Sequence, residues 1–311
     1  MNGELTPAIK TVGLTKHYGD FRALVDLDLE VMGGEVFGFL GPNGAGKTTA
    51  IRTLTDEIRP TTGTATIVGL DCQRDSVAIR ALLGYLPGDL AMYPKLTGRE
   101  TLTFFANLRG GVDWTFVESL ADRLDADLSK RVGELSTGNR QKIGLIQAFM
   151  SRPDVIIMDE PSTGLDPLMQ AEFHTMMREV AGEGRTVFLS SHTLSEVQRA
   201  ADRVAIIRHG RLAAVETITA LQAKAVRRIE LRFAAEVEAS TFTRIDGVND
   251  ADVDGARAVV SFSGDMEALL DAIRSGPSLI DIATHDADLE EIFLTYYRDD
   301  PDPQAERSVE A

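Results

Sequence analysis

The sequence predicts an α/β fold that is built on a buried parallel sheet and carries a helical insertion. Three continuous apolar runs, at residues 36–40, 155–158 and 186–189, have the length of strands that are buried on both faces. Each run ends in polar residues, namely a glycine-rich loop, an acidic pair and a Ser-Ser-His sequence. Ligand sites in such sheets form at the carboxyl ends of the strands, so these polar residues are the candidates for a binding site.

Residues before the first run are expected to form strands and turns. Val25, Leu27, Leu29 and Val31 alternate with acidic residues, which is typical of a half-buried antiparallel strand. The polar loop that precedes them carries Tyr18. This aromatic ring could stack on a base at the end of a phosphate site, or it could pack on its own loop.

The first run leads into residues 41–48, Gly-Pro-Asn-Gly-Ala-Gly-Lys-Thr, which satisfy the pattern G-x-x-x-x-G-K-[ST]. Glycines let backbone N–H groups approach a phosphate, and the helix that begins beside the loop adds its unpaired N–H groups and positive dipole end. A glycine-rich turn with a chance Lys-Thr pair is the alternative, but the strand–loop–helix context favours a phosphate site. The candidate nucleotide-binding residues are Gly41, Pro42, Asn43, Gly44, Ala45, Gly46, Lys47, Thr48 and Thr49.

The middle of the chain is expected to be mostly helical. A turn at residues 59–64 leads into a strand at 65–68, and a helical segment lies around residues 76–86. Three further helices are predicted at residues 97–107, 114–124 and 139–151. Together these helices form an insertion between two parts of the chain that carry strands.

The second and third runs end in candidate catalytic residues. Asp159 follows Lys47 by 112 residues and stands where P-loop NTPases hold the magnesium ion, together with the Thr48 hydroxyl. Glu160 points elsewhere and is placed to polarise a water molecule. His192, at the end of the third run, is expected to face the γ-phosphate. Simple helix capping by the two acids is the alternative.

Composition limits the possible partners. The formal net charge is −16, and residues 216–311 hold 21 acidic and 9 basic residues, so most of the charge lies in the C-terminal part. This balance argues against nucleic acid as a partner. The single cysteine, Cys72, permits no intrachain disulfide and suits a reducing compartment. We expect no signal peptide and no direct membrane span, because no apolar run approaches about 18 residues.

Over residues 8–215 these motifs, in this order, resemble the ATP-binding subunit of an ABC transporter. The resemblance implies a P-loop NTPase core with an antiparallel β subdomain and a helical subdomain, binding ATP and Mg²⁺. It places Tyr18 at the adenine-stacking position, Glu160 as the catalytic base and His192 as the switch histidine. Residues 161–166 resemble the loop through which two such subunits communicate, and Asp166 ends that loop.

Ser136, Thr137, Gly138 and Asn139 resemble the signature motif that binds the ATP held by the opposite subunit. Thr137 and Asn139 replace the commoner Gly and Gln, and the amide of Asn139 is expected to preserve function. Gly88 stands where many members of the family have a glutamine that coordinates magnesium and the attacking water. Either a water molecule takes the place of the glutamine side chain, or the neighbouring Asp89 contributes to this coordination.

The C-terminal part resembles the small accessory domain of drug-export ATPases, similar to those that give resistance to daunorubicin and tetronasin. Alternating apolar residues from Ile229 onward predict a small α+β domain, and residues 287–297 predict an amphipathic helix. The expected domains are residues 1–220, with the helical subdomain at about 88–152, then 221–298, and a disordered acidic tail at 299–311. Dimerisation, a solvated cap and regulation are all possible roles of the accessory domain.

These resemblances imply an ATP-hydrolysing subunit of a drug exporter. It is expected on the cytoplasmic side of a bacterial cell membrane, as a homodimer that docks on an integral membrane permease near residues 87–107. The alternatives are a soluble ABC-type ATPase that acts on nucleic acid or ribosomes, and an importer ATPase. The single phosphate loop, the absence of heptads and the acidic balance favour the exporter over the nucleic-acid alternative.

Overall fold

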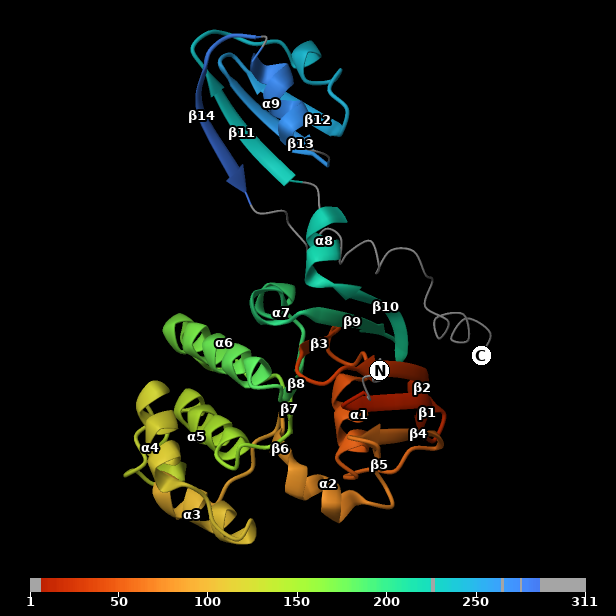
Figure 1. The fold of residues 1–311 in the computed structure, drawn as a ribbon, viewed down its shortest axis with the longest axis vertical. Coiled ribbons are helices and arrows are strands. Elements are labelled where there is room, and N and C mark those ends of the chain that lie inside the picture. Colours follow the sequence, from red (N-terminus) through yellow and green to blue (C-terminus); the bar gives the residue numbers. More distant parts are fainter. Residues whose placement is uncertain (1–6, 225–226, 264–265, 275, 286–311) are drawn as a thin grey trace, which may run out of the picture. The chain divides into compact units, whose positions relative to one another are not determined.

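The computed structural model describes residues 7–224, 227–263, 266–274 and 276–285. The chain divides into two compact units, Met1–Glu216 and Thr217–Ala311, and each is considered by itself. Figure 1 shows helices around a sheet in the first unit and a small sheet with helices in the second. The predicted α/β fold is confirmed.

A six-stranded sheet forms the centre of the first unit, in the order β10-β9-β3-β8-β7-β6. Its strands are β3 (Val36–Leu40), β6 (Leu83–Leu86), β7 (Val155–Asp159), β8 (Thr186–Ser191), β9 (Arg203–Arg208) and β10 (Arg211–Thr217). The pairs from β9 to β6 are parallel, and every residue of β3, β7 and β8 is buried. The three apolar runs are therefore confirmed as buried parallel strands. The helical segment expected around residues 76–86 is wrong at its end, because α2 stops at Leu82 and residues 83–86 form strand β6, which pairs with β7.

A four-stranded sheet in the order β2-β1-β4-β5 supplies the predicted antiparallel layer. Its strands are β1 (Ile9–Tyr18), β2 (Phe21–Val31), β4 (Thr62–Ile67) and β5 (Leu70–Asp71). Leu27 and Leu29 on β2 are buried whereas Asp28 and Glu30 are exposed, which confirms the predicted alternation. The strand predicted at 65–68 ends earlier, because Val68 has a φ of 50° and belongs to the turn before β5.

The helices of the first unit are α1 (Lys47–Leu54), α2 (Ser76–Leu82), α3 (Gly98–Leu108), α4 (Trp114–Arg123), α5 (Thr137–Phe149), α6 (Pro167–Gly182) and α7 (Leu194–Ala200), with a 3₁₀ turn at Val132–Glu134. Helices α3, α4 and α5 pack together as the predicted insertion (Figure 1). Thr97 and Glu100 form a capping box at the start of α3, and the carboxylate of Asp113 caps α4. The sequence therefore sets the points at which both helices begin.

The second unit is an α+β domain, as predicted. It contains α8 (Ile218–Lys224), β11 (Arg227–Phe233), a 3₁₀ turn (Ala239–Thr241), β12 (Val248–Asp254), β13 (Arg257–Phe262), α9 (Met266–Arg274) and β14 (Leu279–His285). The strands form an antiparallel sheet in the order β12-β13-β11-β14, and Ile229, Leu231 and Phe233 of β11 lie in its core. The predicted helix at 287–297 and the tail at 299–311 lie outside the described residues. Among the helices that the structure describes, none is long and apolar enough to cross a membrane.

Candidate functional site

The glycine-rich loop joins β3 to α1 and packs closely against its neighbours. A Cβ atom built on Gly41 would lie 2.5 Å from the carbonyl oxygen of Ile207, and one on Gly46 would lie 2.5 Å from that of Ala23. Gly46 also has a φ of 108°, which L side chains rarely adopt. Only glycine fits these two positions, so the loop keeps its backbone N–H groups at the start of α1.

A pocket of about 210 Å³ opens over this loop. It is lined by Phe21, Ala23, Pro42, Asn43, Gly44, Gly46, Lys47, Thr48, Thr49 and Glu160. Lys47 is 5% exposed, and its ammonium group donates to the carbonyl oxygens of Gly41 at 2.6 Å and Pro42 at 3.2 Å. Backbone N–H groups, a helix start and a held ammonium group are the chemistry that binds a polyphosphate.

The ends of β7 and β8 bring the predicted catalytic residues together. Nδ1 of His192 lies 2.7 Å from Oε2 of Glu160, so the proton on this nitrogen is donated to the carboxylate. The other oxygen of Glu160, Oε1, lies 3.2 Å from Nζ of Lys47. Glu160 is therefore held between the phosphate loop and the histidine.

Two features distinguish Glu160 from an ordinary surface acid. Its φ is 52°, a left-handed conformation that costs energy in a residue other than glycine and is concentrated at functional sites. Its Oε1 atom is buried and accepts no hydrogen bond, because the contact with Lys47 is an ion pair without hydrogen-bond geometry. A buried acceptor without a donor is costly to the fold, so its presence here marks Glu160 as a candidate functional residue.

Asp159 and Thr48 offer oxygen atoms that suit a magnesium ion. Asp159 is 2% exposed, and its Oδ1 accepts a hydrogen bond of 2.5 Å from the hydroxyl of Ser190. Thr48, the second residue of α1, lines the pocket and is exposed. Carboxylate and hydroxyl oxygens are hard ligands, and magnesium completes its shell with water and phosphate oxygens. The donor set therefore fits Mg²⁺ held jointly by the protein and a nucleotide.

The electrostatic environment of Asp159 extends to Tyr85 on β6. Burial, with the negative charges of Glu57 and Asp159, raises the pKa of the Tyr85 phenol. The phenol therefore stays protonated, and it donates a hydrogen bond to Glu57 rather than adding a further negative charge near the site.

Gly88 lies against the Asp159 carboxylate. A Cβ atom at this position would lie 3.0 Å from Oδ2 and 3.2 Å from Cγ of Asp159. Asp89 is exposed. The loop after β6 thus approaches the candidate metal ligand with its backbone, where a side chain would press on the carboxylate.

We expect Gly88→Ala to lower the ATPase rate about tenfold. Mutation of residues that support metal ligands typically costs about 10- to 100-fold in metal affinity or activity, and we expect the lower end of that range here. The new methyl group would displace Oδ2 of Asp159, whose other oxygen is held by Ser190. ATP affinity measured without magnesium should stay unchanged. Gly182→Ala is the control, because a Cβ atom there meets nothing within 4 Å. A wild-type rate for Gly88→Ala would show that the carboxylate can move without cost.

The signature residues do not line this pocket. Ser136 caps α5 by accepting a hydrogen bond from the backbone of Asn139 at 3.3 Å, and Ser136 and Thr137 are exposed. Gly138 packs on Gly164, since a Cβ atom on Gly138 would lie 2.3 Å from the Gly164 carbonyl oxygen. The exposed start of α5 is thus available to a second molecule.

Asp166, predicted at the contact between subunits, caps α6. Its carboxylate accepts hydrogen bonds from the backbone of Leu168 and Met169, both at 3.0 Å. The loop from Pro161 to Asp166 is thereby tied at its end to a sixteen-residue helix.

Sequence reasoning missed Phe21. This residue lines the phosphate pocket, is 53% exposed and lies opposite Tyr18 in the β1–β2 register. Tyr18 is 47% exposed, with Nζ of Lys16 5.0 Å from its ring centroid. Pairing across the hairpin is the signal that could have found Phe21, because the residue opposite a candidate aromatic lies beside it.

Known proteins match the core of this chain and, for two relatives, more than 90% of its length. The family described as ABC transporter matches residues 24–163. The daunorubicin resistance ATP-binding protein DrrA3 of Streptomyces coeruleorubidus is 35% identical over 94% of this chain and 96% of its own length. The bacitracin transport ATP-binding protein BcrA of Enterococcus faecalis is 31% identical over 92% of this chain and 94% of its own. A solved ATP-binding subunit of an ABC transporter has a TM-score of 0.64 and 29% identity, over 70% of this chain and 92% of that one.

Proposed function

We infer that this chain, which belongs to the ABC transporter family, is the ATP-hydrolysing subunit of an exporter that removes drugs or similar small amphipathic molecules. The catalytic geometry carries this inference: one carboxylate, Glu160, lies between the phosphate-loop lysine and His192. The relatives named for resistance to daunorubicin and transport of bacitracin support the export of antibiotics. The permease selects the transported molecule.

Each site residue has a role in hydrolysis. Lys47 and the loop N–H groups hold the β- and γ-phosphates, and Tyr18 stacks on the adenine. Thr48 and Asp159 hold Mg²⁺, which neutralises phosphate charge. Glu160 accepts the proton of the attacking water, and His192 orients Glu160 through the contact of 2.7 Å.

Two copies of the chain form the working unit. Ser136 and Thr137 are exposed and lie outside their own phosphate pocket, so a second copy can place the start of its α5 against the γ-phosphate. A serine at a helix start, followed by a glycine, suits an anion. ATP binding then closes the pair and hydrolysis reopens it.

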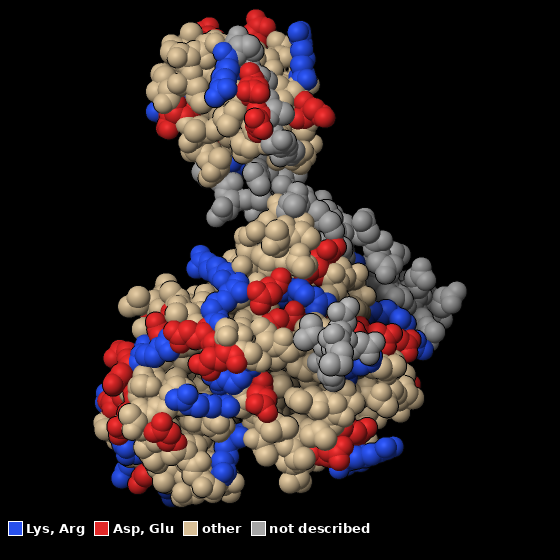
Figure 2. All heavy atoms as spheres, viewed as in Figure 1, with Lys and Arg blue, Asp and Glu red and all other residues tan. Residues whose placement is uncertain are grey.

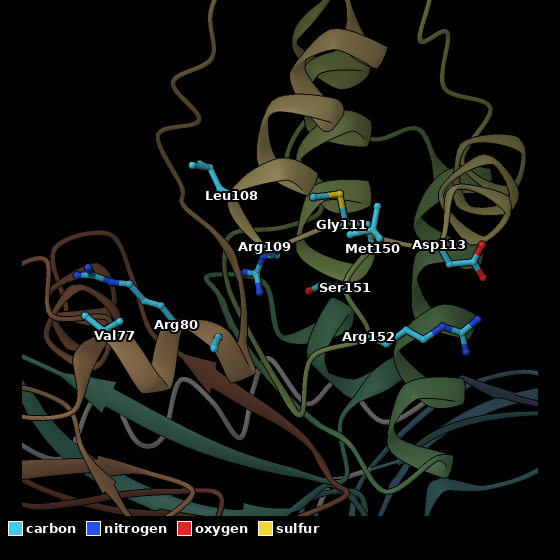
Figure 3. Close-up of a pocket in the computed structure, with 11 residues that line it drawn as sticks. Val77, Arg80, Leu108, Arg109, Gly111, Asp113, Met150, Ser151 and Arg152 are labelled. Carbon is cyan, nitrogen blue, oxygen red and sulfur yellow. The ribbon is translucent and has the colours of Figure 1, made fainter.

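We place the docking site of the permease at a pocket of about 550 Å³ beside the end of α3, next to the expected stretch 87–107 but lined by residues outside it. In Figure 3, Arg109 and Ser151 lie in the middle of this pocket, between Arg80 on one side and Arg152 on the other. The Arg109 guanidinium donates to the Leu83 carbonyl oxygen at 2.6 Å, and burial lowers its pKa. Among the described residues, neither Arg80 nor Arg109 pairs with a carboxylate, and the buried Ser151 hydroxyl has no hydrogen-bond partner. Such a surface suits a cytoplasmic segment of the permease that carries an acidic side chain.

Figure 2 shows basic and acidic side chains interspersed over the visible face of the first unit. A continuous basic surface would favour the alternative of a nucleic-acid-binding ATPase. The mixed charges on this face and the net charge of −16 favour the exporter subunit, located at the cytoplasmic side of the membrane.

A pull-down tests the function as a whole. The tagged Glu160→Gln variant is incubated with ATP and detergent-solubilised membranes, and the recovered proteins are identified by mass spectrometry. Recovery of one polytopic membrane protein is expected. Recovery of ribosomes or nucleic acid without a membrane protein would overturn the exporter function.

We expect Arg109→Glu to reduce recovery of that membrane protein at least tenfold, because a negative charge would replace the half-buried positive one. The exposed Arg80→Glu should act in the same direction and carries less risk to folding. Arg211→Glu, on the exposed start of β10, is the control. Undiminished recovery with both pocket variants would place the docking surface elsewhere.

A further inference from the structure

Two consecutive serines at the end of β8 hold different partners. The hydroxyl of Ser190 bonds to Asp159, whereas the hydroxyl of Ser191 donates to Oε2 of Glu196 at 2.7 Å. Both serines are fully buried. Because successive side chains of a strand point to opposite faces, β8 serves the metal ligand on one side and Glu196 on the other.

Glu196 joins two catalytic loops. Its second oxygen, Oε1, accepts a hydrogen bond of 2.6 Å from the hydroxyl of Ser162, which is 5% exposed. Ser162 lies two residues after Glu160, and Ser191 immediately precedes His192. One carboxylate therefore ties the loop after β7 to the loop after β8, beside the contact between Glu160 and His192.

Helix capping does not account for Glu196. It lies in the first turn of α7, where an acid could cap the helix, but the two hydrogen bonds that its carboxylate accepts come from the side chains of Ser162 and Ser191, which lie on other segments. The N-cap residue of α7, Thr193, makes no capping hydrogen bond with its side chain. Glu196 is thus used to connect loops rather than to start its own helix.

The connection continues to the signature motif. The loop that carries Ser162 also carries Gly164, which packs on Gly138, and its Pro161 carbonyl oxygen accepts a bond of 2.8 Å from the Gln141 side chain. Contacts between neighbouring residues therefore run from the start of α5, through this loop and Glu196, to His192.

We propose that Glu196 is a positioning residue that couples the signature motif and the loop after β7 to His192, and so sets the contact between His192 and Glu160. This inference rests on the proposed ATPase function. The ATP held by the opposite copy binds at the start of α5 of this chain. Through the Ser162–Glu196–Ser191 bridge it then influences Glu160, the base that acts at this chain's own phosphate pocket. Glu196 is not among the residues that line the phosphate pocket, and its carboxylate is bonded to Ser162 and Ser191 instead.

The test compares Glu196→Ala with Glu196→Gln in the purified full-length chain. Glu196→Ala removes both bonds, and we expect kcat for ATP hydrolysis to fall at least tenfold while the Kd for a fluorescent ATP analogue changes less than twofold. Glu196→Gln should recover most of the rate, because an amide can accept from one serine and donate to the other. Ser195→Ala, on the exposed neighbouring residue of α7, is the control.

A double-mutant cycle separates coupling from a general loss of structure. Ser162→Ala should lower kcat alone but have little further effect in the Glu196→Ala background. An unchanged kcat for Glu196→Ala, an equal loss of ATP affinity, or additive effects would each overturn this inference. If the wild-type chain itself fails to hydrolyse ATP, the proposed function fails instead, so the two failures are distinguishable.

Discussion

Replacing Lys47 with alanine is expected to weaken ATP binding by about 100-fold or more. Hydrogen bonds to a charged group contribute roughly 1.5–3 kcal/mol each, and a lysine in this loop reaches two phosphates. The ammonium group is buried and already held by the Gly41 and Pro42 carbonyl oxygens, so a phosphate meets a donor whose position is fixed in advance. The loss should appear in Kd, measured by titration with a fluorescent ATP analogue, as well as in turnover.

The Lys47→Ala variant also removes the ion-pair partner of Glu160. Its folding should therefore be checked by circular dichroism and thermal unfolding before the affinity is interpreted. Lys10→Ala is a matched control, since Lys10 is 45% exposed and pairs with Glu30 on the antiparallel sheet. Wild-type ATP affinity in a folded Lys47→Ala protein would remove the glycine-rich loop from the nucleotide site.

The core of the site could be predicted because its determinants are local in sequence. The strand, the glycine-rich loop and the start of α1 occupy fewer than twenty consecutive residues, from Val36 to Leu54. Apolar runs predicted β7 and β8, and the polar residues at their ends gave Asp159, Glu160 and His192. Parallel strands then bring these ends to one edge, as the contact between Glu160 and His192 confirms.

What the sequence left undecided depends on contacts between distant segments. Strand β6 is a short Leu-Gly-Tyr-Leu sequence, and it becomes a strand because it pairs with β7, some 70 residues away. The place of Gly88 against Asp159 and the bridge made by Glu196 likewise arise only once the sheet has assembled. No periodicity in the sequence reports which acid will meet which serine.

The Glu160→Gln variant should bind ATP yet lose turnover by about 10²- to 10⁴-fold, the range that a general base contributes. Glutamine has the same shape and can still accept the proton of His192 Nδ1, so the geometry is preserved while the base is lost. ATP should then hold two copies together, and a shift from monomer to dimer should be seen by light scattering only with ATP present. Glu183→Gln, an exposed acid after α6, is the control and should turn over normally. Normal turnover by Glu160→Gln would remove Glu160 from the mechanism. Lost turnover without dimers would count against the closure of two copies around ATP.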